Sequence, residues 1–160
     1  MSIIRKKKLY RLDTKMNIMH QKVAIYNNKI KESAELIFES YSDSAENVGL
    51  TLVLAGLGRY KFQGSDFYTA LFGLRALLEP KSIVICINGC RLDFVCSSMG
   101  QQMSQGKVGY IVEMGKRGTN RVGTFNHYDD LDKLTTVNKQ MDYIRQWSES
   151  LKGQFTGYIK

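Results

Sequence analysis

The chain has 160 residues, of which 43% are hydrophobic and 24% charged, as is typical of one soluble globular domain. It has neither an apolar run of the roughly 18 residues that a membrane-spanning helix needs nor the apolar segment of a secretory signal. We therefore expect a cytoplasmic protein that makes no membrane contact. Basic residues outnumber acidic ones by 23 to 15, and the net charge of +8 favours an anionic partner.

The first predicted element is a helix over residues 14–40. Asp13 or Thr14 can cap its start, and apolar residues recur along it at steps of three, four or seven: Met16, Met19, Val23, Tyr26, Ile30 and Ile37. This pattern is typical of an ordinary packing helix, and a coiled-coil dimer is the alternative. With the basic residues that precede it, the helix forms a predicted N-terminal segment over residues 1–48.

The glycine-rich middle of the chain, residues 49–126, is predicted to form the sheet core. LTLVL at 50–54 is a β-rich strand, and a helix over 65–79 begins at the cap Ser65 and ends before Pro80. SIVICIN then predicts a buried central strand, followed by a hairpin turn at Asn88 and Gly89 and a strand up to Val95. Residues 107–114 and 121–125 predict a further hairpin, and the glycines of GLGRYKFQG predict a hairpin or bulge.

The last predicted element is a C-terminal helix within residues 127–160. Asp129 or Asp130 can cap it, and its apolar stripe steps by three or four: Leu134, Val137, Met141, Ile144, Trp147 and Leu151. We predict one α+β domain, in which a largely antiparallel sheet of four to five strands is packed by one central helix and by N- and C-terminal helices.

The stretch CSSMGQQMSQG predicts a short helix between two strands. Ser97 or Ser98 caps it, and Gly106 ends it. Met99 and Met103 are four residues apart, and we expect them to point inward as gap-fillers. The outer face then presents Gln101, Gln102 and Gln105, a polar patch suited to a partner protein.

Catalytic and metal chemistry find little support in the sequence. The three cysteines, Cys86, Cys90 and Cys96, are odd in number, which favours reduced thiols, and their spacing does not fit a structural zinc site. A catalytic Cys96 would require His127 as its base, and the glycine-rich stretch before Ser65 lacks a phosphate-binding motif. We predict a protein that is not an enzyme and holds no metal or cofactor.

Three motifs follow one another between residues 50 and 126. The helix carries Ala70, Leu71, Leu74, Arg75, Leu78 and Glu79; the predicted turn carries Asn88, Gly89 and Arg91; and the stretch after it carries Ser97, Met99, Met103, Gly106 and Tyr110. In this order and spacing the chain resembles small immunity proteins of bacterial polymorphic toxin systems, including those of contact-dependent growth inhibition. It departs from that pattern at several positions: Cys90 and Gly109 replace alanines, Ser98 and Ser104 replace glycines, and Gln102 replaces an aspartate.

The resemblance implies a non-catalytic protein that binds the C-terminal domain of a cognate toxin, commonly a nuclease, and that is compatible with a monomer before toxin binding. We expect a polar, charge-complementary interface. The candidate toxin-binding residues are Arg91, Asp93, Gln101, Gln102, Gln105, Lys107, Lys116 and Arg117. The basic surface would then face acidic toxin residues.

The alternative is a basic nucleic-acid-binding module. The basic residues between positions 5 and 11 would form a phosphate-contacting arm, and Lys116, Arg117 and Arg121 a second contact. A third possibility is an enzyme that depends on Cys96.

Overall fold

We describe the protein from a computed structural model, which covers residues 16–41, 44–56 and 58–159. Its strands are β1 (Met16–Asn27), β2 (Ile30–Tyr41), β3 (Ser44–Leu54), β4 (Gly58–Gly64), β5 (Ile83–Ile85), β6 (Phe94–Val95), β7 (Val108–Ile111) and β8 (Asn120–Gly123). Its helices are α2 (Phe67–Leu78), α3 (Ser98–Ser104) and α4 (Val137–Ile159), with short 3₁₀ turns η1 (Glu79–Lys81) and η2 (Asn88–Cys90).

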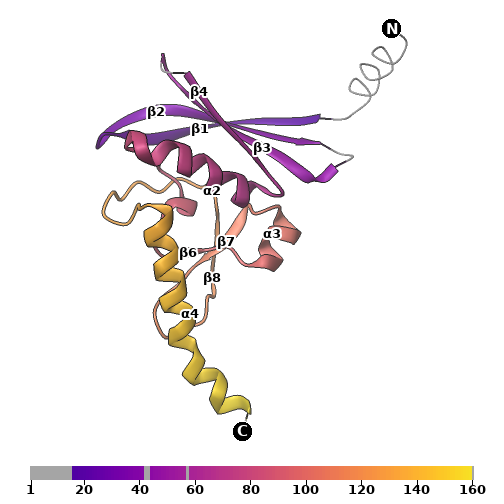
Figure 1. The fold of residues 1–160 in the computed structure, drawn as a ribbon, viewed down its shortest axis with the longest axis vertical. Coiled ribbons are helices and arrows are strands. Elements are labelled where there is room, and N and C mark those ends of the chain that lie inside the picture. The colour runs from indigo at the N-terminus through magenta and orange to yellow at the C-terminus, as the bar shows by residue number, and fades with distance from the viewer. Residues whose placement is uncertain (1–15, 42–43, 57, 160) are drawn as a thin grey trace.

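The strands form two antiparallel sheets, so the predicted α+β class and antiparallel pairing are confirmed. One sheet has five strands in the order β4-β3-β2-β1-β5, and the other has three in the order β6-β7-β8. Helix α2 lies across one face of the five-stranded sheet, and the three-stranded sheet lies on the other side of α2 (Figure 1). The helix is thus buried on both sides, which explains its run of apolar residues.

The predicted helix over residues 14–40 is wrong for the described residues from Met16 on, which form the β1–β2 hairpin. Asn28 and Lys29 both have positive φ, at 49° and 69°, as a two-residue hairpin turn between Asn27 and Ile30 requires. The proposed caps Asp13 and Thr14 lie outside the described residues. The sheet therefore begins well before the predicted boundary at residue 49.

The residues of this hairpin that join the core over α2 are two apart on each strand: Val23 and Ile25 of β1, and Leu36 and Phe38 of β2. Ile37, between the last two, is also buried, at 8%, but is not part of that core cluster. Several residues of the supposed helical stripe are exposed: Met16, Met19 and Ile30. The helix-like spacing is a coincidence, because it combines residues from two strands, of which only some face the core.

Helix α2 begins one residue later than predicted. Its N-cap is Asp66, not Ser65, and the Asp66 carboxylate accepts a hydrogen bond from Thr69 N at 2.8 Å. The η1 turn that follows contains Pro80 and closes the helix. The first residue of α2, Phe67, packs edge to face against Phe38 at a centroid distance of 5.3 Å, which fixes the helix on the sheet.

Two further predictions in the middle of the chain are corrected. β5 is largely buried, but of the strands that the structure describes it pairs only with β1 and so lies at an edge of the five-stranded sheet. Asn88 and Gly89 form part of η2 and have no positive φ, so they make no hairpin turn. The predicted hairpin of residues 107–125 is confirmed by the pairing of β7 with β8.

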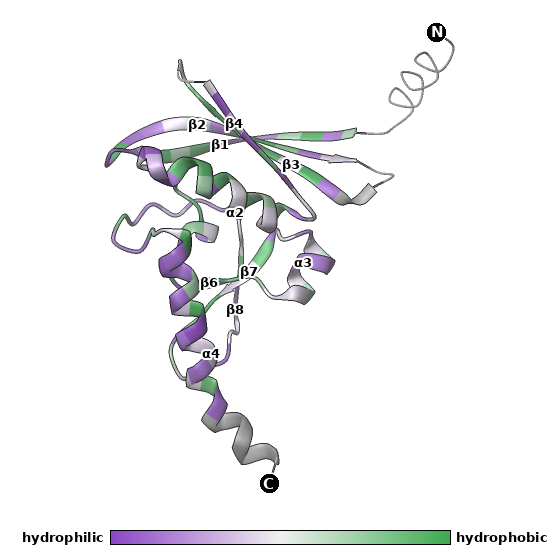
Figure 2. Ribbon diagram, viewed as in Figure 1, coloured by the Kyte–Doolittle hydropathy of each residue, from purple (hydrophilic) through white to green (hydrophobic). Residues whose placement is uncertain are grey.

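Helix α4 begins at Val137, well after the predicted caps Asp129 and Asp130. Glu79 Oε2 accepts a hydrogen bond from Val137 N at 3.0 Å, and Thr136 Oγ1 accepts one from Lys139 N at 3.4 Å. Figure 2 shows α4 as a mostly hydrophilic helix, consistent with packing along one face only. Asp129 and Asp130 lie in the loop before α4 and do not cap it.

Candidate partner-binding surface

The segment from Asn88 to Gly106 starts with η2, which is part of the core. Gly89 N donates to Thr124 O at 2.8 Å, and Asn88 Nδ2 donates to Gly123 O at 3.0 Å. A Cβ on Gly89 would lie 2.7 Å from Leu71 Cδ2, so no larger residue fits there without displacement. Asn88 and Gly89 therefore anchor the segment to β8 and α2.

A buried polar cluster joins η2 to α2 and α4. Arg75 Nη1 donates to Gln140 Oε1 at 2.6 Å, and Arg75 Nη2 donates to Thr135 O at 2.8 Å. Gln140 Nε2 donates to Gly89 O at 2.9 Å and to Arg91 O at 2.7 Å. The motif arginine thus holds three elements together. Sequence reasoning missed Gln140, because its partners lie far away along the chain.

Arg91 and Asp93, both proposed to bind a toxin, are largely used within the protein. They form a two-point ion pair at 2.8 and 3.0 Å, and each side chain is only 14% exposed. The Arg91 guanidinium also stacks on the Tyr128 ring at 4.0 Å, and Lys133 approaches Asp93 at 3.9 Å. These contacts assign Arg91 and Asp93 a positioning role for the loop before β6.

Helix α3 begins at the predicted cap, because the Ser97 hydroxyl accepts from Gly100 N at 3.0 Å. It ends with Gln105 and Gly106 in left-handed conformations. Gln105 O accepts a hydrogen bond from Phe67 N at 2.8 Å, which ties the end of α3 to the start of α2. The short helix is therefore held at both ends.

The predicted faces of α3 are wrong for the two methionines and for Gln101, but Gln102 and Gln105 are exposed as predicted. Met99 is 68% exposed and Met103 82% exposed, so neither fills the core. The inner face carries small and polar residues, with Gln101 Nε2 donating to Thr69 Oγ1 at 3.3 Å. A Cβ on Gly100 would lie 3.1 Å from Val108 O, so α3 sits too close to β7 for a large side chain. Exposed glutamines accompany the methionines: Gln102 and Gln105.

The remaining predicted residues lie along β7, β8 and their connection. Lys107 Nζ lies over the Phe67 ring at 5.0 Å, and Lys116 forms an ion pair with Glu113 at 2.9 Å. Lys116 and Arg117 are exposed and line a shallow pocket of about 280 Å³. They belong to the turn beyond β7, so the structure does not bring them onto α3.

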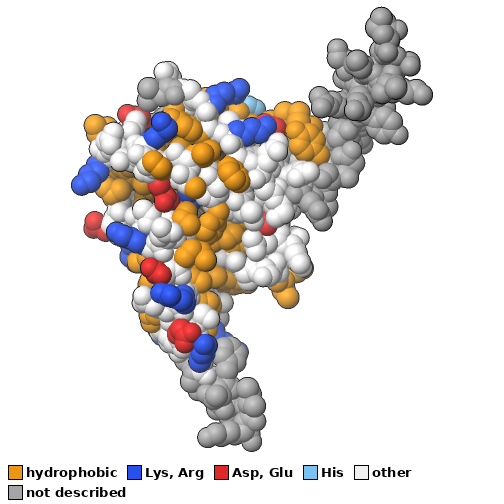
Figure 3. Space-filling view, in the orientation of Figure 1, with side chains coloured by type: hydrophobic (Ala, Val, Ile, Leu, Met, Phe, Trp, Pro, Cys, Tyr) orange, Lys and Arg blue, Asp and Glu red, His pale blue; other side chains and the backbone are white. Residues whose placement is uncertain are grey.

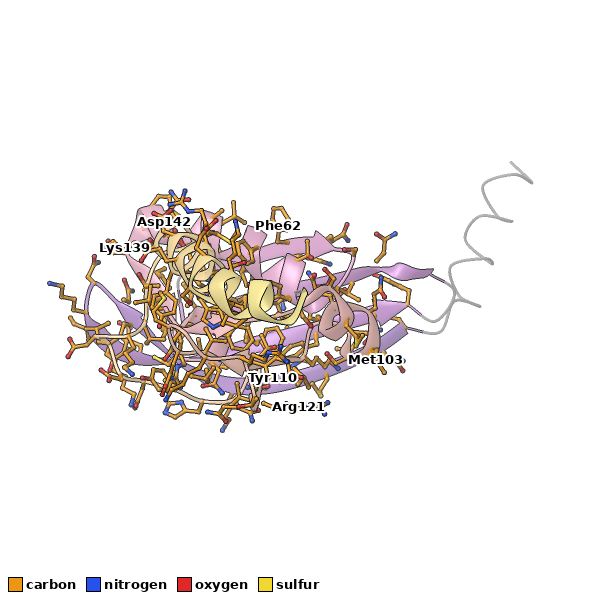
Figure 4. All side chains as sticks on the ribbon, turned by 90° about the horizontal axis from the view of Figure 1, so that it is seen from below. Phe62, Met103, Tyr110, Arg121, Lys139 and Asp142 are labelled. Atoms are coloured by element: carbon orange, nitrogen blue, oxygen red, sulfur yellow. The ribbon has the colours of Figure 1, made fainter. Side chains whose placement is uncertain are left out.

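Figure 4 shows Met103, Tyr110 and Arg121 along one side of the molecule, opposite Phe62, Lys139 and Asp142. Tyr110 and Arg121 face each other in the β7–β8 register. Arg121 is exposed and forms no ion pair with the other described residues. We group Tyr110 and Arg121 with the exposed residues of α3 and its C-cap as the α3–β8 surface, whose members are Met99, Gln102, Met103, Gln105, Tyr110 and Arg121.

The cysteines are poorly suited to nucleophilic chemistry. Burial raises the pKa of the Cys96 thiol to about 11, with a smaller contribution from the Asp66 carboxylate, so the thiol is protonated at neutral pH. Burial likewise raises the pKa of Cys86 to about 11 and also raises that of Cys90. His127 is the base that a catalytic Cys96 would require, and its Nε2 lies 3.3 Å from Asp129 Oδ2. Within residues 16–41, 44–56 and 58–159, no cluster of three potential metal ligands occurs.

Other proposed or overlooked sites have structural roles. Gly56, in the turn after β3, and Gly58, the first residue of β4, adopt positive φ, consistent with the predicted hairpin. The basic residues 5–11 lie outside the described residues.

A pocket of about 500 Å³, which the sequence did not indicate, lies beside Tyr26, Glu79 and Thr136, where Glu79 caps α4.

In comparisons with known proteins, no family model and no curated protein matches this sequence significantly. None of the helices in the described part of the chain combines the length and the apolar character needed to cross a bilayer.

Proposed function

We propose that this protein is a non-catalytic immunity protein, which acts in the cytoplasm and neutralises a cognate toxin domain. The toxin domain would be a nuclease, and this protein would cover its active site or its substrate-binding surface. We infer that the α3–β8 surface makes the contact. The motif residues that resemble immunity proteins support the class, and the exposure of Met99 and Met103 is the observation that carries the proposed surface.

Two exposed methionines on a seven-residue helix have no role within the described fold. Methionine is enriched at protein interfaces, where its flexible thioether adapts to the partner. The neighbouring glutamines are polar but uncharged, so burying them against a partner requires hydrogen bonds but no desolvation of charge. Such a composition suits the centre of an interface.

The two tethers of α3 favour this role. The cap at Ser97 and the hydrogen bond from Phe67 N to Gln105 O hold the helix in place before any partner arrives. A preordered surface loses less conformational entropy on binding than a mobile one. Arg121 at the margin adds a positive charge, which favours an acidic toxin face and fast association.

The test is co-expression with the C-terminal domain of a toxin encoded by the neighbouring gene, with growth and co-purification as readouts. We expect the unaltered protein to restore growth and to bind the toxin domain. Met103→Glu should raise the Kd at least about tenfold, because a carboxylate would enter an apolar contact.

Met141→Glu is the matched control, since Met141 is also an exposed methionine, at 47%, but lies on α4. It should leave toxin binding unchanged. Absence of both binding and growth rescue would overturn the proposed function. Binding that Met103→Glu and Met141→Glu affect equally would overturn only the proposed surface.

Arg121, Lys116 and Arg117 support the second candidate, a nucleic-acid-binding module. All three are exposed and belong to β8 or the turn before it. Nanomolar, sequence-selective oligonucleotide binding that Arg121→Glu abolishes would favour this function. Weak oligonucleotide binding that disappears as salt is raised would instead show nonspecific attraction to the basic surface.

A further inference from the structure

Strand β4 forms an edge of the five-stranded sheet, because among the described strands it pairs only with β3. Most of its residues are exposed, including Arg59, Lys61 and Gln63. An edge strand presents backbone N–H and C=O groups that can pair with another chain. β4 offers seven residues in the sequence GRYKFQG, enough for several such pairs.

The hydrogen-bond alternation identifies which groups face outward. Cys86 N donates to Ala24 O, so the even-numbered residues of β1 face β5 and the odd-numbered ones face β2. Carrying this alternation through the registers of β1–β2, β2–β3 and β3–β4 directs the even-numbered residues of β4 toward β3. The backbone groups of Arg59, Lys61 and Gln63 therefore point to the free edge. Within the described part of the chain, no hydrogen bond reaches them.

An apolar shelf lies on the inner side of this edge. Phe62 is 40% exposed and packs over Gly73 of α2, where an added Cβ would lie 2.1 Å from the Phe62 ring. Leu77, one helical turn beyond Gly73, is 42% exposed. Figure 3 shows hydrophobic side chains reaching the surface over α2 and β4, with Lys and Arg side chains near them. A strand added to β4 would rest alternate side chains on this shelf.

The outer side of the edge is basic. Arg59 forms no ion pair among the described residues. Lys61 reaches inward across Gly49 to Glu39, with Nζ 3.2 Å from Oε2. Lys81 lies on the inner side, with its ammonium 5.8 Å from the centre of the Tyr60 ring, and does not add to the charge of the outer side. A carboxylate opposite Arg59 would find an unpaired cation.

From this juxtaposition we infer that the free edge of β4 binds an extended segment of another protein, in which acidic and apolar residues alternate. The acidic side chains lie beside Arg59 and Lys61, and the apolar ones lie on Phe62 and Leu77. Backbone pairing gives the affinity, and the alternating side chains give the selectivity. This site lies on the opposite side of the molecule from the α3–β8 surface, and it does not depend on that partner being a toxin (Figure 4).

Charge also distinguishes this partner from two other occupants. Antiparallel pairing of two β4 strands centred on Lys61 would place two Lys61 side chains opposite each other, which is destabilising. Residues 1–15 of this chain contain six lysines and arginines against one aspartate and would meet Arg59 with like charge. An acidic segment from a different protein fits the edge better than either.

The test uses the full chain and a blocked synthetic peptide, acetyl-Gly-Glu-Val-Glu-Ile-Glu-Gly-amide, with the same peptide carrying Lys for Glu as comparison. NMR titration up to millimolar peptide should give saturable binding of the acidic peptide and at least tenfold weaker binding of the basic one. Amide exchange should slow at Arg59, Lys61 and Gln63, while Tyr60 and Phe62, already paired with β3, should change little.

Three variants make the outcome decisive. Arg59→Glu should weaken acidic-peptide binding at least tenfold. Lys22→Glu makes the same charge reversal on the same face of the sheet, but on β1, and should leave this binding unchanged. Gln63→Pro removes one outward N–H without touching a β3–β4 hydrogen bond, and should weaken binding at unchanged charge. Circular dichroism checks that each variant folds.

Any of four results would overturn the inference: no saturable binding, equal binding of both peptides, equal effects of Arg59→Glu and Lys22→Glu, or dimerisation of the protein through β4. None of them bears on Met103→Glu and the toxin domain, so failure here is distinguishable from failure of the proposed function.

Discussion

Replacing Gln140 by leucine tests whether the buried polar cluster holds α4 to the rest of the protein. Gln140 is fully buried and makes three hydrogen bonds, one as acceptor from Arg75 and two as donor to Gly89 O and Arg91 O. Leucine has a similar volume, so Gln140→Leu removes the hydrogen bonds without opening a large cavity.

The expected cost follows from the groups left behind. Arg91 O loses the donor supplied by Gln140, and Arg75 Nη1 keeps only a 3.3 Å contact to Gly89 O. A buried polar group without its partner costs about 1–3 kcal/mol, and more when it is charged. With a neutral carbonyl and a guanidinium both affected, we expect Gln140→Leu to lower the free energy of unfolding by about 3–5 kcal/mol. That is a large fraction of the roughly 5–15 kcal/mol typical of a domain.

Urea unfolding followed by circular dichroism and by Trp147 fluorescence measures this effect. The Trp147 indole donates to Lys116 O at 2.7 Å, so its emission reports on the docking of α4 against the β7–β8 turn. Lys139→Leu is the control, because Lys139 is exposed on the same helix, and it should change stability by about 0.5 kcal/mol or less. A Gln140→Leu protein within about 1 kcal/mol of the unaltered one would refute the role of the cluster.

Two further predictions concern Gly106 and Cys96. Gly106 has a φ of +79°, and a Cβ there would lie 2.5 Å from Tyr68 N. Gly106→Ala should therefore lower the free energy of unfolding, measured in urea, by at least about 2 kcal/mol. An unchanged free energy of unfolding would contradict the close approach of Gly106 to Tyr68. Because burial raises the pKa of Cys96 to about 11, its alkylation by iodoacetamide in the folded protein should keep accelerating with pH up to about 11. A rate that levels off near pH 9, as expected of an unfolded thiol, would contradict that burial.

The fold class could be predicted because it depends on local patterns that the sequence carries. The apolar face of α2 and the β7–β8 hairpin each lie within a short stretch of chain, and both are confirmed. The β1–β2 hairpin was missed because its turn, Asn28–Lys29, lacks glycine, although asparagine adopts positive φ more readily than most residues. The alternation of Val23 and Ile25 with Lys22, Ala24 and Tyr26 in β1 was a local strand signal, but β2 gives none, because its apolar residues Leu36, Ile37 and Phe38 are consecutive.

Site residues were harder to predict, because their surroundings come from distant parts of the chain. The spacing of Met99 and Met103 shows that they share a helix face, but only the close approach of Gly100 to Val108 decides which face is inside. Arg91 was expected at the surface, on the wetter face of the strand predicted up to Val95. Its partner Asp93 is local, but Tyr128, on which it stacks, comes from a loop beyond β8.

The segment from Asn88 to Gly106 therefore divides into two parts with different roles. Its first part is buried with the Arg75 and Gln140 cluster, and changes there should reduce stability and binding together. The outward methionines of its second part contribute no packing to the described core, so changes there should reduce binding at nearly constant stability. Measuring both quantities on each variant separates residues that shape the surface from residues that touch a partner, which exposure alone does not.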